Sequence, residues 1–183
     1  MRGVALAPGK HEIGPEAASL LVKTYREGLA AKAGHDLTIE VADWSATVEV
    51  PDDPAGSSFA LDADARSLQV REGVGGAKPL NDKDRADIAK TIDDKILHGQ
   101  PISFRSDAVR SVDGGLSVGG ALTLAGETRP VTAQLQVGAD GRLTATIPLT
   151  QSAWGIKPYR GMMGALKVRD ELEILVDAKL PAG

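Results

Sequence analysis

Cysteine is absent from the 183 residues of this chain. Its absence excludes disulfides, thiolate nucleophiles, iron–sulfur clusters and zinc sites built on cysteine. Aromatic residues make up only 3% of the chain, so the core must be built from leucine, valine, isoleucine and alanine. No apolar run approaches the ~18 residues of a membrane-spanning helix. The apolar stretch at residues 1–9 is too short for a signal-peptide core, so we expect a soluble, cytoplasmic protein unless a leader has been removed.

Positive charge is also in the minority, because the net charge is −4 with the histidines neutral. A broad nucleic-acid surface needs a net basic face, so we expect no nucleic-acid partner. A chain of this length corresponds to one domain, here residues 1–183, and is long enough to bury a core without disulfides or metals.

What the chain does contain is a succession of short runs in which apolar and polar residues alternate. Such alternation predicts half-buried β-strands. The clearest run covers residues 44–50, and Asp-Gly pairs at 113–114 and 140–141 predict tight hairpin turns. Counting the others gives about eight or nine strands, in the segments 18–26, 37–42, 59–66, 102–106, 116–124, 131–137, 143–149 and 172–178. Antiparallel strands joined by hairpins favour a barrel or a sandwich.

Residues 81–98 break this pattern. Ile88, Ala89, Ile92 and Ile96 have the spacing of one helix face. Asn81 or Asp82 can cap the start, and Gly99 and Pro101 end it. We therefore predict a helix inserted between two strands, preceded by a glycine-rich loop at 73–79.

The segment 102–137 resembles the YceI-like family. The resemblance is carried by Phe104-Arg105-Ser106 and by the stretch Leu-Thr-Leu-Ala-Gly-Glu-Thr-Arg-Pro-Val at 122–131. Residues 44–48, and 82–85 ahead of the helix, support it. The resemblance covers roughly residues 10–180. It implies an all-β fold with one or two short helices, a closed, lipocalin-like antiparallel barrel of about eight strands, with an elongated apolar cavity and binding of a polyisoprenoid or another long-chain lipid.

His35-Asp36 is the most interesting polar pair. Neighbouring residues of a strand point to opposite faces, which disfavours a catalytic dyad. His35 is open to three interpretations: a structural turn residue, a contact to a ligand head group, or a residue with metal or acid–base chemistry. The sequence Gly-Leu-Ser-Val-Gly at 115–119 matches a nucleophile elbow, but it follows a hairpin and no histidine lies beyond His98, so we interpret it as a strand.

The loop at 154–164 is the best candidate for a portal. Its paired methionines offer adaptable apolar surface, and nearby cations suit a phosphate head group. A plug folded over the barrel end is an equal alternative.

We therefore predict a carrier or sequestering protein for an apolar small molecule, an isoprenoid or fatty lipid, with no cofactor, catalytic residue or metal. An enzyme that uses His35 and a ligand-free stress or interaction module are the alternatives, and exposed edge strands make a homodimer plausible. The candidate ligand contacts are Leu21, Tyr25, His35, Phe59, Leu61, Phe104, Leu122, Ile147, Trp154, Arg160, Met162 and Met163.

Overall fold

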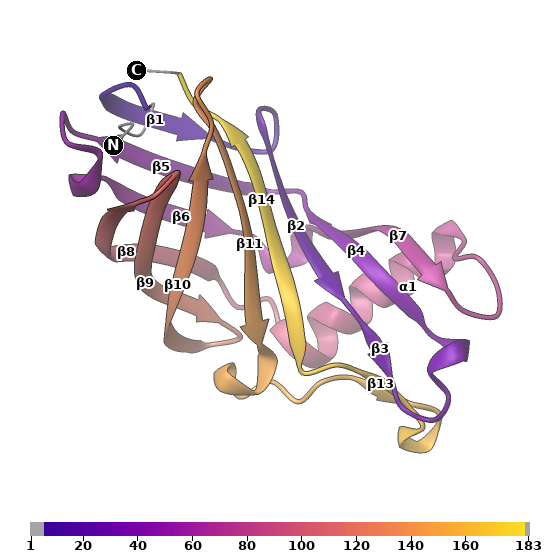
Figure 1. Ribbon diagram of the computed structural model, residues 1–183. Coiled ribbons are helices and arrows are strands. Elements are labelled where there is room, and N and C mark those ends of the chain that lie inside the picture. Colours follow the sequence, from indigo (N-terminus) through magenta and orange to yellow (C-terminus); the bar gives the residue numbers. More distant parts are fainter. Residues whose placement is uncertain (1–5, 182–183) are drawn as a thin grey trace.

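Most of the chain forms one long antiparallel sheet that curls around itself (Figure 1). The computed structural model describes residues 6–181; most of the N-terminal apolar stretch considered above, residues 1–5, lies outside them. Within the described residues the sheet has eleven strands, in the spatial order β1 (Gly9–Ile13), β5 (Trp44–Val50), β6 (Ser58–Ala63), β8 (Ile102–Val112), β9 (Gly115–Leu124), β10 (Glu127–Val137), β11 (Arg142–Thr150), β14 (Glu171–Lys179), β2 (Ala18–Thr24), β4 (His35–Val41) and β7 (Leu68–Gly75).

A second, small sheet lies at the lower end of the molecule in Figure 1. It consists of β12 (Arg160–Gly161), β13 (Leu166–Val168) and β3 (Arg26–Glu27), with β13 in the middle. The two segments that supply it are far apart in sequence, and their pairing fixes both at the same end of the large sheet.

The hairpins form where the sequence predicts them. Gly114 joins β8 to β9 with φ of +76°, and Gly141 leads into β11 with φ of +83°. These left-handed conformations are the reason for glycine in the two Asp-Gly pairs. β8 to β11 are therefore consecutive neighbours in the sheet.

The expected closed barrel of eight strands is wrong: the sheet is a curled half-barrel with two free edges, β1 and β7. The physical reason is a corner in the hairpin that runs from residue 35 to residue 75. β4 pairs with β7 below the corner, and β5 pairs with β6 above it. At the corner the strands are interrupted at residues 42–43 and by a 3₁₀ turn, Ala65–Ser67. Below the corner, β4 pairs with β2, and above it, β6 pairs with β8. The two halves of the hairpin therefore extend the sheet at its two different ends.

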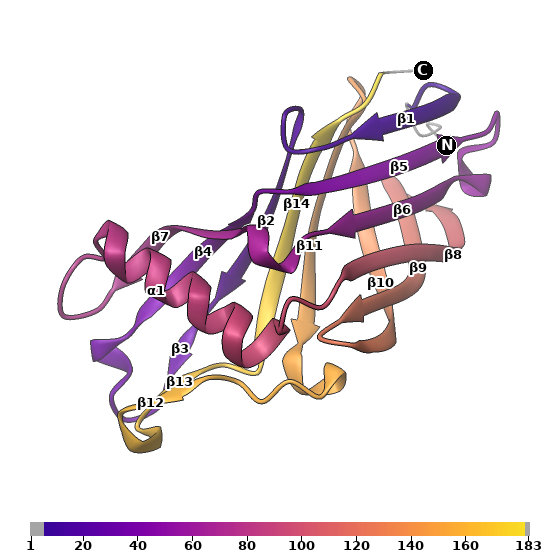
Figure 2. The ribbon, with the colours of Figure 1, turned by 180° about the vertical axis from the view of Figure 1, so that it is seen from behind.

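Helix α1 (Asp82–Ile92) lies across the resulting opening, as seen from behind in Figure 2. Asn81, one of the two predicted caps, is the N-cap, and it forms a capping box with Asp84. A π-helical turn, Asp93–Leu97, continues the helix, and His98 ends it in a left-handed conformation with φ of 51°. The helix ends one residue before Gly99, close to the predicted boundary.

The largest cluster of buried residues lies at the end of the curled sheet where the described part of the chain begins and ends. The buried residues there are Leu6, Val48, Val50, Leu116, Val118, Leu135, Leu143, Ala145, Ala178 and Leu180. A smaller cluster of Leu149, Trp154 and Ile156 fills the space at the opposite end, next to the turn between β9 and β10. A third cluster, of Leu20, Val41 and Trp44, is buried where β2, β4 and β5 meet. Residues of all three clusters surround an interior space that side chains do not fill.

Candidate functional site: an apolar cavity

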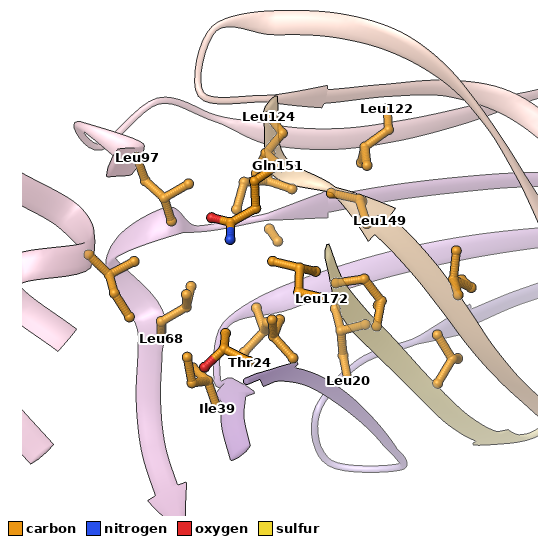
Figure 3. A pocket seen from close by; sticks show the side chains of 18 of the residues that line it. Leu20, Thr24, Ile39, Leu68, Leu97, Leu122, Leu124, Leu149, Gln151 and Leu172 are labelled. Atoms are coloured by element: carbon orange, nitrogen blue, oxygen red, sulfur yellow. The ribbon is translucent and has the colours of Figure 1, made fainter. Parts of the chain in front are cut away.

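A cavity of about 590 Å³ lies between the concave face of the sheet and helix α1. Its wall is mostly apolar, and Figure 3 shows leucines from several strands converging on it. Four of the six aromatic residues, Trp44, Phe59, Phe104 and Tyr159, also line it, and most of the remaining lining residues are aliphatic. A smooth apolar wall of this kind matches a hydrocarbon chain and offers few fixed hydrogen-bonding positions.

Strand alternation decides which residues reach the cavity. On β2, Leu20, Val22 and Thr24 line it. Leu21 lies between two of them and therefore on the outer face of the sheet. The prediction that Leu21 points into the cavity is therefore wrong.

A few polar groups do face the cavity, and two of them, Gln151 and Thr24, lie toward the end that carries the small sheet. Gln151 is only 5% exposed, and its Nε2 donates to the carbonyl oxygen of Arg169 at 2.9 Å. Its side-chain amide and the hydroxyl of Thr24 both enter the interior shown in Figure 3. The indole N–H of Trp44, in the cavity wall, is buried without a hydrogen-bond partner in the described part of the chain.

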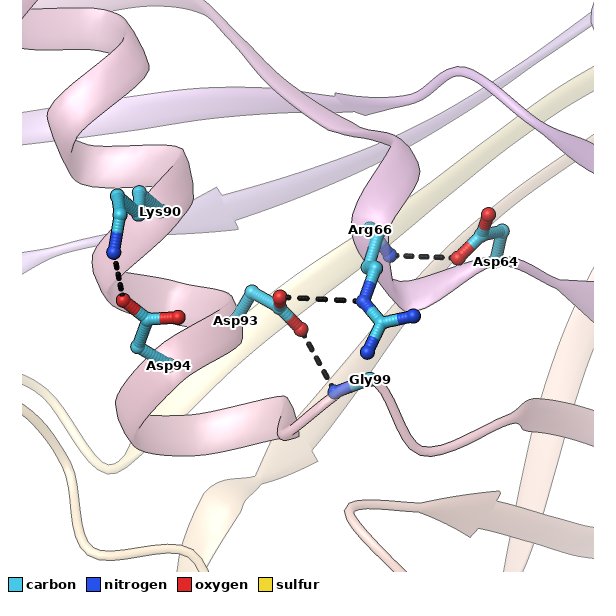
Figure 4. A network of polar contacts seen from close by, with 6 residues as sticks. All are labelled: Asp64, Arg66, Lys90, Asp93, Asp94 and Gly99. Atoms are coloured by element: carbon cyan, nitrogen blue, oxygen red, sulfur yellow. Dashed lines mark hydrogen bonds and ion pairs between the residues drawn. The ribbon is translucent and has the colours of Figure 1, made fainter.

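Helix α1 closes the open side of the half-barrel with its apolar face. Ile88, Ile92 and Ile96, three of the four residues predicted to form that face, line the cavity. Figure 4 shows how the end of the helix is held at the corner of the sheet. Arg66 Nε lies 3.5 Å from Asp93 Oδ2, and Asp93 Oδ1 accepts the Gly99 N–H at 2.7 Å.

The glycine-rich segment after β7 packs against His35 at the rim of the cavity. His35 Nε2 is hydrogen-bonded to the carbonyl oxygen of Lys78 at 2.7 Å. Gly76 has φ of +77°, and a Cβ at that position would lie 2.2 Å from His35 Nε2. Only glycine allows the chain to cross the imidazole this closely. His35 thus joins the start of β4 to the segment that leads into α1.

Six of the predicted ligand contacts line the cavity. They come from five strands, and they are His35, Phe59, Leu61, Phe104, Leu122 and Ile147. All of them except His35 are apolar residues in strands where apolar and polar residues alternate, and this alternation predicted that they point inward. Gln151 and Thr24 also line the cavity, and no pattern in the sequence selects them. Tyr159, in the predicted portal loop, lines it as well.

The remaining predicted contacts lie elsewhere. Trp154 is buried in the cluster with Leu149, and its Nε1 donates to the Leu122 carbonyl at 2.9 Å, so this part of the loop is a plug. Arg160, Met162 and Met163 are exposed at the small sheet.

Tyr25 belongs to a polar cluster beside the rim. Its hydroxyl donates to Oε1 of Glu173, and the guanidinium of Arg169 lies 5.8 Å from the centre of its ring. The hydrogen bond to Glu173 raises the pKa of Tyr25 above its ordinary value, and burial raises it further. Tyr25 therefore stays protonated as a donor at neutral pH.

The polar pairs singled out in the sequence are engaged in structural contacts. Asp36 Oδ1 accepts the Arg26 backbone N–H at 2.9 Å, which ties β4 to β3. Ser117 lies in β9 and accepts a hydrogen bond from Gln134 Nε2 at 3.1 Å. Residues 6–181 contain no group of three or more potential metal ligands and no helix long and apolar enough to cross a membrane.

A curled antiparallel sheet around an apolar cavity defines a barrel-like fold. The model of the YceI-like domain matches residues 16–180, so this chain belongs to the YceI-like family.

Among solved structures, BcnA of Burkholderia cenocepacia is 18% identical, with a TM-score of 0.61 over 86% of this chain and 94% of that one. The YCEI protein of Campylobacter jejuni is 11% identical, with a TM-score of 0.55 over 76% of this chain and 81% of that one. A polyisoprenoid binding domain from Saccharophagus degradans is 10% identical, with a TM-score of 0.48 over 90% and 99%. No curated protein matches this chain significantly.

Proposed function

We propose that this protein binds one long-chain apolar molecule, an isoprenoid or a fatty lipid, in the cavity and thereby carries or sequesters it. The observation that carries the proposal is the unfilled space of about 590 Å³ that the three packed clusters surround, bounded mostly by apolar side chains. This volume falls within the ~300–1,000 Å³ of small-molecule sites.

The wall supplies the free energy of binding. Each methylene transferred from water contributes about 0.8 kcal/mol, so ten buried methylenes contribute about 8 kcal/mol before the cost of association. No catalytic group is needed for an affinity of this origin. Leu61, Phe104, Leu122 and Ile147, which sit on different strands, are the proposed contacts along the chain.

The distribution of polar groups sets the orientation of the ligand. The end near the chain termini is closed by tightly packed aliphatic residues. Gln151 and Thr24 lie toward the other end, where His35 forms part of the rim. A ligand with an apolar tail and one polar end is therefore bound tail first, with its polar end near Gln151.

A series of straight-chain alcohols tests the proposal by isothermal titration of lipid-extracted protein. The binding free energy should become more favourable by about 0.8 kcal/mol per methylene until the cavity is filled, and then level off. The heat-capacity change should be negative and grow with chain length over the same range. Affinity that does not depend on chain length would contradict the proposal.

A further inference from the structure

Exposed apolar side chains gather at one end of this molecule. Among the described residues six large hydrophobic side chains are exposed, and four of them lie in two segments, 26–34 and 155–169. These segments are joined by the small sheet, and we call them together the tip. Leu29 and Met163 are fully exposed, and Met162 and Tyr159 are 59% and 40% exposed.

The backbone of the tip holds these side chains outward. Met162 and Met163 both have left-handed backbones, with φ of 49° and 57°. Such conformations are uncommon for residues other than glycine and need support from their surroundings. Part of that support is the hydrogen bond from the Ala30 N–H to the Ala165 carbonyl at 2.9 Å, which ties the two loops together. Leu29 and the methionines therefore project from neighbouring loops.

The tip is also strongly basic in an acidic protein. The two segments carry six lysine and arginine residues against one glutamate, a net charge of +5, while the whole chain carries −4 and the remainder therefore −9. Arg26 is 3.9 Å from Asp36, but the other five cations have no acidic partner within salt-bridge distance among residues 6–181. They are Lys32, Lys157, Arg160, Lys167 and Arg169.

We propose that the tip docks on the surface of an anionic phospholipid bilayer. Exposed apolar side chains and cations on the same surface are the combination that interfacial binding requires: the apolar side chains insert among the acyl chains while the cations contact the phosphates. The acidic remainder of the molecule is repelled by the same surface, so charge alone orients the protein tip first.

Docking in this orientation places the cavity over the bilayer. Arg26, Tyr159 and Leu166 belong to the tip and also line the cavity, so the rim of the cavity faces the lipid. The docking surface does not depend on what the cavity holds, because Leu29 and Met163 do not line it.

Sedimentation with vesicles tests the proposal. The intact protein should bind vesicles of phosphatidylcholine and phosphatidylglycerol in equal parts and bind pure phosphatidylcholine much more weakly. The double variant Leu29→Ser and Met163→Ser should lose about tenfold or more in affinity. Val112→Ser is the matched control, because Val112 is an exposed valine at the opposite end of the sheet and its loss should have no effect.

The electrostatic part has its own control. Arg160→Gln should weaken binding to the anionic vesicles about fivefold. Arg110→Gln removes an exposed arginine near the C-terminal end of β8, away from the tip, and should leave binding unchanged. Raising the ionic strength to about 1 M, where the Debye length is about 3 Å, should abolish most of the binding. Circular dichroism establishes that each variant is folded.

Absence of binding to the anionic vesicles, or equal loss in the tip variants and their controls, overturns the proposal. So does concentration-dependent dimerisation through the tip in analytical ultracentrifugation, because the exposed side chains would then serve a second copy of the chain. Chain-length-dependent alcohol binding can succeed in any of these cases, so the cavity and the tip are tested separately.

Discussion

A bulky side chain introduced into the cavity wall distinguishes a barrel with a ligand-binding cavity from a barrel whose interior is packed. Ala133 lies in the middle of β10, is 8% exposed and lines the cavity. It belongs to none of the three packed clusters formed by the described residues. Ala133→Phe therefore places a phenyl ring in unfilled space. Thr132→Phe is the matched control, because Thr132 is the exposed neighbour on the outer face of the same strand.

The expected magnitude follows from the space that the ring takes. A phenyl ring displaces roughly four methylenes of a bound chain, at about 0.8 kcal/mol each. The loss of about 3 kcal/mol weakens long-chain binding about 200-fold. The free energy of unfolding of the ligand-free variant should be unchanged or raised, because the ring fills empty space; in a packed core the same change would cost about 1–3 kcal/mol.

Calorimetric titration with a long-chain alcohol and urea unfolding of the ligand-free protein measure the two quantities. Thr132→Phe should match the unsubstituted protein in binding. An Ala133→Phe variant that unfolds more readily and binds as well as the control would refute the cavity as the binding site.

Three further predictions concern the framework and are checked by unfolding experiments. Leu116→Ala should lower the free energy of unfolding, measured in urea, by about 2–5 kcal/mol, because Leu116 is fully buried in the packed cluster. Trp154→Phe should lower the free energy of unfolding by about 1 kcal/mol, because the half-buried Leu122 carbonyl loses its donor; a variant as stable as the unsubstituted protein would contradict this. The pKa of Tyr25 is raised in the folded protein by its hydrogen bond to Glu173. The resulting stability is fully present below about pH 10, the ordinary tyrosine value, and is lost as the pH rises through the folded pKa. Tyr25→Phe should lack this alkaline component; an identical pH profile would refute it.

The strands that could be predicted are those whose two faces differ chemically. β5 reads apolar and polar in strict alternation, and its buried residues Trp44, Val48 and Val50 are those on the predicted face. β1 was missed because it is an edge strand with only Ile13 as a large apolar residue. β7 was missed because its last residues contain Gly73 and Gly75, which indicate a loop, whereas their lack of side chains lets His35 and Arg26 pack against the strand.

The same argument accounts for the candidate site. Phe59, Leu61 and Phe104 were predicted because polar neighbours fix the phase of their strands. Leu21 was placed on the wrong face because Leu20, Leu21 and Val22 are all apolar, so alternation does not show which of them point inward. Gln151 could not be found, since its burial depends on a carbonyl 18 residues further along the chain.

The open barrel follows from interactions that no local pattern reports. Alternation cannot show that one hairpin bends at residues 42–43 and pairs its two halves with opposite sides of the sheet. Nor can it show that α1 covers the gap rather than lying outside a closed wall, although three of the four residues of its predicted apolar face do line the cavity.

The most direct test of the central claim is native mass spectrometry of the freshly purified protein, followed by organic extraction and identification of the extract. The account predicts a stoichiometric adduct that is released as one long-chain lipid with a single polar end, and that is absent from Ala133→Phe but present in Thr132→Phe. A clean unliganded mass, together with failure to take up added isoprenoids or fatty alcohols, would contradict it.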